Sequence, residues 1–191
     1  MPTYRNHKTS KYTNYFKYGV PILDTKEDFF KLNEILKKEQ TLLIIKLHPA
    51  ENIEPIKVMN LSNIKFLDSN VLYENDVTIY HCLKGIDALI TDYSSIFYDF
   101  LLLNRPIGLA IPDLEEYKKN NKLFIKKFDD LGSDCLYNFI DIKNFILNLS
   151  KGIDSNYSKR LYAIKKFHKY TDNNSSSRFV DFFEKVFNKK V

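Results

Sequence analysis

The sequence predicts an α/β fold: a Rossmann-like parallel sheet with helices on both faces. Three short, continuous apolar runs at residues 41–47, 88–91 and 107–111 have the length and composition of strands buried in a parallel sheet. Segments with helical spacing of apolar residues separate these runs, and such alternation is typical of parallel sheets. A chain of 191 residues, 44% of them hydrophobic, is long enough to bury such a core. We therefore expect a single domain.

The first regular element is a predicted helix at residues 25–39, after an irregular, polar and aromatic lead-in at residues 1–23. Asp24 or Thr25 can cap the start of this helix. Its apolar side chains fall on one face at helical spacing: Phe29, Leu32, Ile35 and Leu36. The strand at residues 41–47 follows directly, and its unbroken apolar run predicts burial on both sides.

The middle of the chain alternates strands and helices. In order, we expect a strand at 64–67, a helix at 77–84 ended by Gly85, a strand at 88–91, a helix at 96–103, a strand at 107–111 closed by Pro112, and a helix at 114–120. Further helices are predicted at 141–149, 157–170 and 176–187, with the aromatic side chains of 179–187 in the core. Residues 24–150 would form the α/β core. Residues 151–191 would add terminal helices that pack on the sheet or reach another domain.

Composition excludes several classes of protein. The two cysteines fit neither a disulfide framework nor a zinc site. No apolar run approaches the roughly 18 residues that span a bilayer, and no GxGxxG or Walker loop is present. The net charge of +5 has two possible explanations. It can follow from a composition generally rich in Lys, Asn, Ile and Tyr, or it can serve to attract an anionic ligand or membrane surface. We expect a cytoplasmic protein, peripheral to a membrane at most.

The segment 87–105 (DALITDYSSIFYDFLLLNR) carries the clearest chemical signal. A short apolar run ends at Asp92, the chain turns through Ser94 and Ser95, and a second apolar run begins at once. A helix that starts in this way directs backbone N–H groups and the positive end of its dipole outward, which suits a phosphate or diphosphate. The serines can also act as an ordinary helix cap. The two roles are compatible, because a helix start has several donors.

Three loops follow predicted strands and should open at one edge of the sheet, where ligands of open α/β sheets bind. In the first, His48 precedes Pro49, which favours an extended conformation. His48 can bind a diphosphate or donate a proton, or it can bond only to nearby backbone. In the third loop, which begins near Asp113, Glu115 or Glu116 can accept hydrogen bonds from ribose hydroxyls. The alternative for this acidic pair is compensation of a helix dipole.

The sequence leaves the roles of two charged residues open. The Arg5 guanidinium suits phosphate geometry, and the alternative is a solvated terminal arginine. Asp99 lies inside an apolar helix and needs a partner, so a structural hydrogen bond to a neighbouring loop is the favoured interpretation. Three histidines have no partner at metal-ligand spacing: His7, His81 and His168. We expect no metal and no cofactor, and core packing for His81.

Four elements, in this order, resemble the C-terminal part of the CDP-glycerol glycerophosphotransferase family, the teichoic-acid and capsule polymerases and primases. They are PTYR at residues 2–5, KLHP at 46–49, LITDYSSIFYDFLLLNRP at 89–106 and DLEEY at 113–117. The central block is specific, and the resemblance covers nearly the whole chain. It implies the C-terminal half of a GT-B glycosyltransferase-like fold, in which two Rossmann-like domains face each other across a cleft.

The resemblance implies transfer of glycerol phosphate, or of ribitol phosphate in relatives, from a CDP-polyol to a polyol-phosphate or lipid-linked saccharide acceptor, with release of CMP. The residues implied in binding the donor diphosphate are Arg5, His48, Ser94 and Ser95. His48 would also be catalytic, meeting charge on the departing CMP. Those implied near ribose and cytidine are Thr3, Asp113, Glu115 and Glu116. No nucleic-acid partner is expected.

Two departures from the family limit these implications. The family often has Arg-Gly shortly after the acidic element, where this chain has Asn120, Asn121 and Lys122. We expect the N-terminal acceptor domain, with its catalytic base, to be absent, and we therefore expect a donor-binding half that is inactive alone. One alternative is a GT-B domain that uses another nucleotide sugar, and another is a nucleotide-binding module without catalysis. Peripheral association with the inner face of the membrane would follow from a lipid-linked acceptor.

Overall fold

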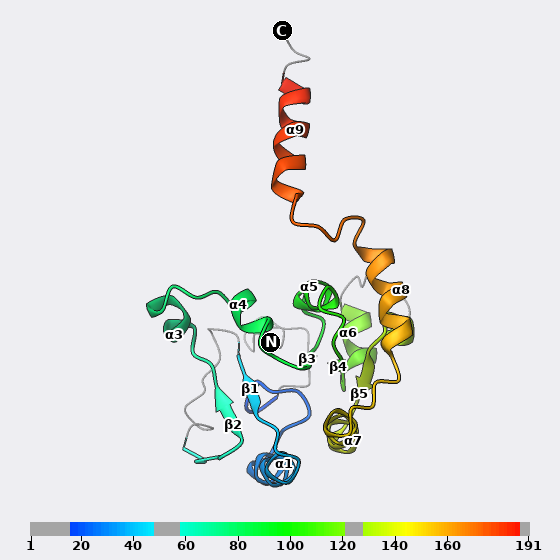
Figure 1. Cartoon of the computed structure of the whole chain (residues 1–191). Helices are drawn as coiled ribbons and strands as arrows, with labels where there is room; N and C mark the ends of the chain where they lie inside the picture. Colours follow the sequence, from blue (N-terminus) through cyan, green and yellow to red (C-terminus); the bar gives the residue numbers. More distant parts are fainter. Residues whose placement is uncertain (1–15, 48–57, 121–127, 188–191) are drawn as a thin grey trace.

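The computed structural model describes residues 16–47, 58–120 and 128–187 (Figure 1). In chain order the elements are α1 (Lys26–Lys38), β1 (Leu43–Ile45), β2 (Ile64–Phe66), α3 (Ser69–Glu74), α4 (Ile79–Leu83), β3 (Leu89–Thr91), α5 (Ile96–Leu101), β4 (Ile107–Ala110), α6 (Leu114–Asn120), the 3₁₀ turn η1 (Phe128–Leu131), β5 (Asp134–Leu136), α7 (Phe139–Ser150), α8 (Tyr157–Phe167) and α9 (Ser175–Phe187). The predicted alternation of strands and helices is confirmed. The short helix α3, the turn η1 and the strand β5 were not predicted.

All strand pairs in the described part of the chain are parallel, as expected. β1 pairs with β2, with Leu43 opposite Ile64. β4 is the middle strand of β3–β4–β5, and its Leu109 lies opposite Thr91 on one side and Cys135 on the other. All four residues of β4 are buried, which is the behaviour of a central strand covered on both faces. The carboxyl ends of β3 and β4 therefore lie side by side.

Helices cover the two faces of the sheets, which confirms the predicted Rossmann-like layering. On one face, α1 and α7 contact each other and share an apolar core with β1 and β2 (Figure 1). Thr25 caps α1 by accepting the Asp28 N–H, as expected for a helix that starts there. On the other face, α5 and α8 enclose a second core with β3 and β4.

Gly132 lets α8 approach this second core closely. Its φ is +72°, and a Cβ there would come within 2.4 Å of the Arg160 backbone. A side chain at this position would both strain the backbone and push α8 outward.

The burial of β1 differs from the prediction. Ile45 and Leu47 are buried against the α1 core, whereas Leu42 and Ile44 are about half exposed. The strand thus alternates in burial although its sequence does not alternate in polarity. An apolar run shows that both faces can be buried but not what covers the second one.

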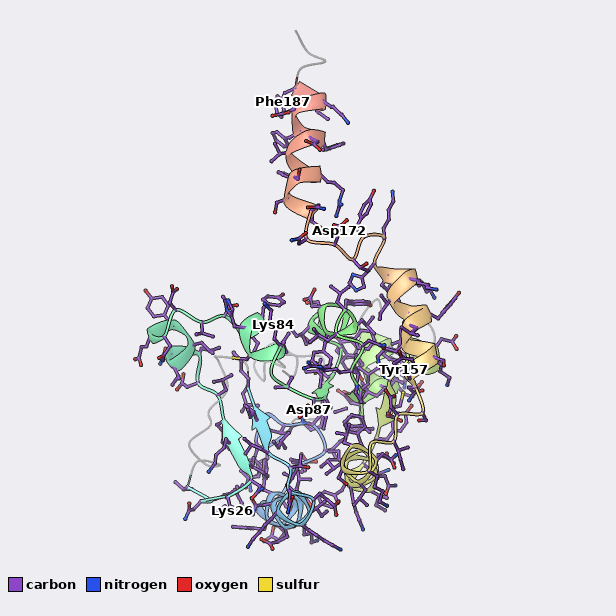
Figure 2. The ribbon with its side chains drawn as sticks, in the orientation of Figure 1. Lys26, Lys84, Asp87, Tyr157, Asp172 and Phe187 are labelled. Carbon is purple, nitrogen blue, oxygen red and sulfur yellow. The ribbon has the colours of Figure 1, made fainter. Side chains whose placement is uncertain are left out.

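The aromatic residues of α9 were predicted to lie in the core, and this prediction is wrong. α9 projects away from the rest of the protein, with side chains on all its sides facing outward between Asp172 and Phe187 (Figure 2). Phe179, Phe182 and Phe183 are 63%, 64% and 47% exposed. The helix is strongly amphipathic, so its periodicity was correctly identified, but periodicity does not say where the partner of an apolar face lies.

A local cluster fixes the start of α9. The guanidinium of Arg178 binds both carboxylate oxygens of Asp172 and lies over the ring of Tyr170, 3.9 Å from its centroid. Asp172 also accepts the N–H of Asn174. These contacts tie the first turn of α9 to the segment that leaves α8, so the projecting orientation of the helix has a local structural basis.

Candidate functional site: the loops after β3 and β4

The serine turn, residues 92–95, begins where β3 ends. Asp92 is buried, and its Oδ1 accepts the N–H of Ser94 at 3.2 Å, which bends the chain directly after the strand. The carbonyls of Ser94 and Ser95 then accept the N–H groups of Phe97 and Tyr98 and start α5. Ser95 stands at the N-cap position but makes no side-chain capping bond. Ser94 is half-buried and Ser95 exposed, so both remain candidates for contact with a ligand.

The predicted convergence of post-strand loops is confirmed for the second and third loops. The hydroxyl of Tyr93, within the serine turn, donates to Oδ1 of Asp113 at 3.0 Å. Asp113 is 6% exposed and directly precedes α6. The rings of Tyr93 and Tyr117 stack with centroids 3.6 Å apart. Hydrogen bonding and stacking thus join the loops after β3 and β4 at the edge where a ligand is expected.

The two acidic residues in the first turn of α6, Glu115 and Glu116, lie in different environments. Glu115 is exposed and forms an ion pair with Lys118 at 2.7 Å, which lowers the pKa of its carboxyl. Glu116 is half-buried. Their position at a helix start also fits the alternative of dipole compensation, and a contact of either residue with ribose stays a prediction.

A cavity of about 80 Å³ lies between β1 and β3. Towards the carboxyl ends of these strands its lining includes Lys46, Thr91 and Asp92, and the rest is apolar. The Lys46 ammonium donates to Oγ of Ser69 at the start of α3, at 3.0 Å. The end of β1 therefore lies near the serine turn, although β1 and β3 belong to separate sheets.

Three predicted site residues, Thr3, Arg5 and His48, lie outside the described residues. Of the others, the structure brings Ser94, Ser95 and Asp113 together through Tyr93 and places Glu115 and Glu116 in the adjoining helix. No role was predicted for Tyr93. Its position inside the serine turn was the available signal, but its partner is twenty residues away and could not be identified from spacing.

Two polar residues of α4 have structural roles. The hydroxyl of Tyr80 donates to Oδ2 of Asp99 at 3.0 Å, which confirms the expected structural hydrogen bond, although the donor lies on a helix. This contact also raises the pKa of the Tyr80 hydroxyl. His81 was predicted in the core and is instead exposed, where its Nδ1 contacts the N–H and hydroxyl of Thr78. A polar ring at the first turn of a short helix satisfies backbone donors better than it fills a core.

The described part of the chain holds neither a group of metal ligands nor a membrane-spanning helix. Within residues 16–47, 58–120 and 128–187, no group of three or more His, Cys, Asp or Glu side chains could hold a metal ion. Each helix of these same ranges is too short or too polar to cross a membrane.

The chain matches a known protein family over nearly its whole length. The family model described as CDP-Glycerol:Poly(glycerophosphate) glycerophosphotransferase matches residues 1–185. The teichoic acid glycerol-phosphate primase of Bacillus subtilis (strain 168) is 30% identical over 149 residues, covering 78% of this chain and 36% of the relative. The teichoic acid ribitol-phosphate polymerase TarL of Staphylococcus aureus (strain NCTC 8325 / PS 47) is 26% identical over 185 residues, covering 94% of this chain and 29% of the relative.

Among solved structures, the wall teichoic acid polymerase TagF matches the whole chain with a TM-score of 0.64 and 19% identity, over 43% of its own length. A variant of that polymerase soaked with CDPG matches with a TM-score of 0.65. This likeness confirms the GT-B-like α/β fold. The chain spans about a third of the length of the two curated relatives. Because the family model covers nearly all of it, the chain belongs to the CDP-glycerol:poly(glycerophosphate) glycerophosphotransferase family.

Proposed function

We propose that the chain is the donor-binding half of a transferase that moves glycerol phosphate or ribitol phosphate from a CDP-polyol to a teichoic-acid-type acceptor and releases CMP. The observation that carries this proposal is the family match over residues 1–185. The similar proteins include a glycerol-phosphate primase and a ribitol-phosphate polymerase, so either polyol fits. Membrane-linked acceptors and a place at the inner membrane face belong to the same proposal.

The serine turn supports this assignment. Ser94 and Ser95 lie at the carboxyl end of β3, in the position where ligands of parallel sheets bind. Their hydroxyls are suitable donors to phosphate oxygens, and the Lys46 ammonium at the end of β1 adds positive charge to this edge. We place the donor diphosphate here, together with His48 and Arg5. Ribose and cytidine would extend towards Thr3 and α6.

The proposed reaction is an in-line displacement at the β-phosphorus of the CDP-polyol. An oxygen–phosphorus bond forms from the acceptor hydroxyl, and the bond from the bridging oxygen to the β-phosphorus breaks. CMP leaves with that electron pair, and the hydroxyl proton passes to a base that we assign to no residue of this chain. The diphosphate ligands Arg5, His48, Ser94 and Ser95 would stabilise the charge that develops on CMP.

Calorimetric titration of the chain tests the proposal. We expect saturable binding of CDP-glycerol or CDP-ribitol and of CDP, and weaker binding of UDP-glucose. Absence of binding to every cytidine nucleotide would overturn it, and stronger binding of UDP-glucose would favour a sugar transferase. His48→Ala should weaken CDP binding more than cytidine binding. Equal affinity of this variant and the wild type for CDP would remove His48 from the site.

A further inference from the structure

We propose that Tyr93 is a positioning residue that holds the serine turn in register with the loop before α6, and that Asp113 acts through Tyr93 rather than by contact with the donor. The inference rests on the proposed function of the serine turn. It reassigns Asp113, which the family resemblance implies as a ribose or cytidine ligand, to a hydrogen bond that links two loops.

Asp113 is placed to brace its neighbours. Asp113 is only 6% exposed, and its Oδ1 accepts a hydrogen bond from the Tyr93 hydroxyl at 3.0 Å. Its carbonyl accepts the N–H of Tyr117 at 2.8 Å, so the same residue helps to start α6. A buried carboxylate bound in this way holds two loops together, and it offers little surface to a ribose in solvent.

The Tyr93 ring is held from two directions. It stacks on Tyr117 with an interplanar angle of 16°, and it meets the edge of Phe128 at a centroid distance of 6.3 Å. Phe128 belongs to the buried core around β3 and β4. The direction of the phenol is therefore fixed by packing before any ligand binds, and the hydroxyl selects where Asp113 lies relative to it.

The backbone transmits this position to the diphosphate site. Tyr93 lies between Asp92, which is buried and accepts the Ser94 N–H, and Ser94 itself. Movement of the ring towards or away from α6 therefore moves the serines. Loss of the hydroxyl should weaken the binding of ligands that contact the serines. It should leave the binding of cytidine, which lacks phosphate, nearly unaffected.

Tyr93→Phe tests the positioning role, because it removes the hydroxyl and keeps the ring. Tyr80→Phe is the matched control, since Tyr80 also donates to an aspartate at 3.0 Å but lies on α4. Affinities of the full chain for CDP and for cytidine would be measured by calorimetry. We expect Tyr93→Phe to weaken CDP binding about threefold to tenfold and to keep the affinity for cytidine within about twofold of the wild type. Tyr80→Phe should change neither affinity by more than about twofold.

The ratio of the affinity for CDP to the affinity for cytidine decides the result. A fraction of misfolded protein lowers the number of binding sites without changing this ratio. An unchanged ratio in Tyr93→Phe would overturn the inference while leaving the proposed function intact. Absence of CDP binding by the wild type would instead overturn the proposed function.

Asp113→Asn distinguishes positioning from direct contact. The amide oxygen can still accept the Tyr93 hydroxyl, so we expect the variant to keep CDP affinity within about threefold and cytidine affinity within about twofold. If the carboxylate binds ribose, the affinity for cytidine should fall by tenfold or more, because hydrogen bonds to charged groups are the stronger ones. That fall would overturn the role assigned to Asp113.

Discussion

The guanidinium of Arg160 is fully buried in α8 and paired with the carboxylate of Asp154, in the loop before that helix. The same guanidinium donates to the carbonyl of Gly132 at 3.3 Å and to the carbonyl of Asn104 at 3.4 Å. One side chain thus joins α8 to the end of η1 and to the chain after α5. This connection anchors the helix that closes the core behind the serine turn.

Replacing Arg160 should destabilise the protein strongly. Arg160→Met keeps helix propensity and an apolar stem, but it removes the ion pair with Asp154 and the donor to two carbonyls. We expect the free energy of unfolding to fall by about 3 kcal/mol, measured by urea titration. Arg178→Met is the matched control, because Arg178 pairs with Asp172 at the surface, where solvent screens the pair, so its loss of stability should be much smaller. Equal losses in the two variants would contradict the structural role of Arg160.

Asp134, at the start of β5, should make stability depend on pH. Burial, opposed in part by a hydrogen bond from Asn156, raises the pKa of its carboxyl above 3.8. Folding therefore favours the neutral form of the Asp134 carboxyl relative to the unfolded chain. Relative to Asp134→Asn, the wild type should lose stability as pH rises through the raised pKa, and the difference between the two proteins should stop changing with pH below about pH 3.8. The loss at pH 7 should stay below about 1 kcal/mol, because the side chain is half exposed.

Thermal unfolding of both proteins between pH 3 and pH 7 measures this difference. Asp172→Asn serves as the opposite case, because Arg178 lowers the pKa of the Asp172 carboxyl. Removing that carboxylate should therefore reduce stability at neutral pH and have no effect at low pH. A wild type that gains stability over Asp134→Asn as pH rises would contradict the assignment.

The projecting helix α9 should be dispensable for the stability of the core. A chain ending at residue 171 loses the exposed apolar face around Phe179, Phe183 and Phe187, none of which lies in either buried core. We expect its melting temperature to stay within about 3 °C of the full chain and its solubility to rise. Phe179→Ser/Phe183→Ser in the full chain should raise solubility in the same way. A much lower melting temperature for the shortened chain would show that α9 packs on the core.

Sequence patterns predicted the parts of this fold that depend on local chemistry. The helix at 114–120 agrees with α6 at both ends, and Thr25 caps α1 where a cap was expected. The serine turn also lies directly after its strand, because an apolar run, an aspartate and two serines impose that turn locally. β5 was missed because its three residues include a half-buried aspartate and carry no strand pattern.

Relationships between distant residues could not be predicted from the sequence. The order of strands implied that the loops after β3 and β4 would meet, but not that Tyr93 and Asp113 would form the contact. The apolar face of α9 was recognised and assigned to the wrong place, because amphipathicity does not locate a partner. Whether Ser94 and Ser95 bind phosphate is likewise a matter of ligand contact, and it stays a prediction.

The affinity of Ser94→Ala/Ser95→Ala for CDP and for cytidine tests whether the serine turn holds the donor diphosphate. Ser95 makes no capping bond, so the change should not weaken the start of α5 by loss of a cap. We expect the variant to bind CDP at least about tenfold more weakly than the wild type does and to bind cytidine equally well, since two hydroxyl donors to a charged group are lost. CDP affinity equal to that of the wild type would contradict it.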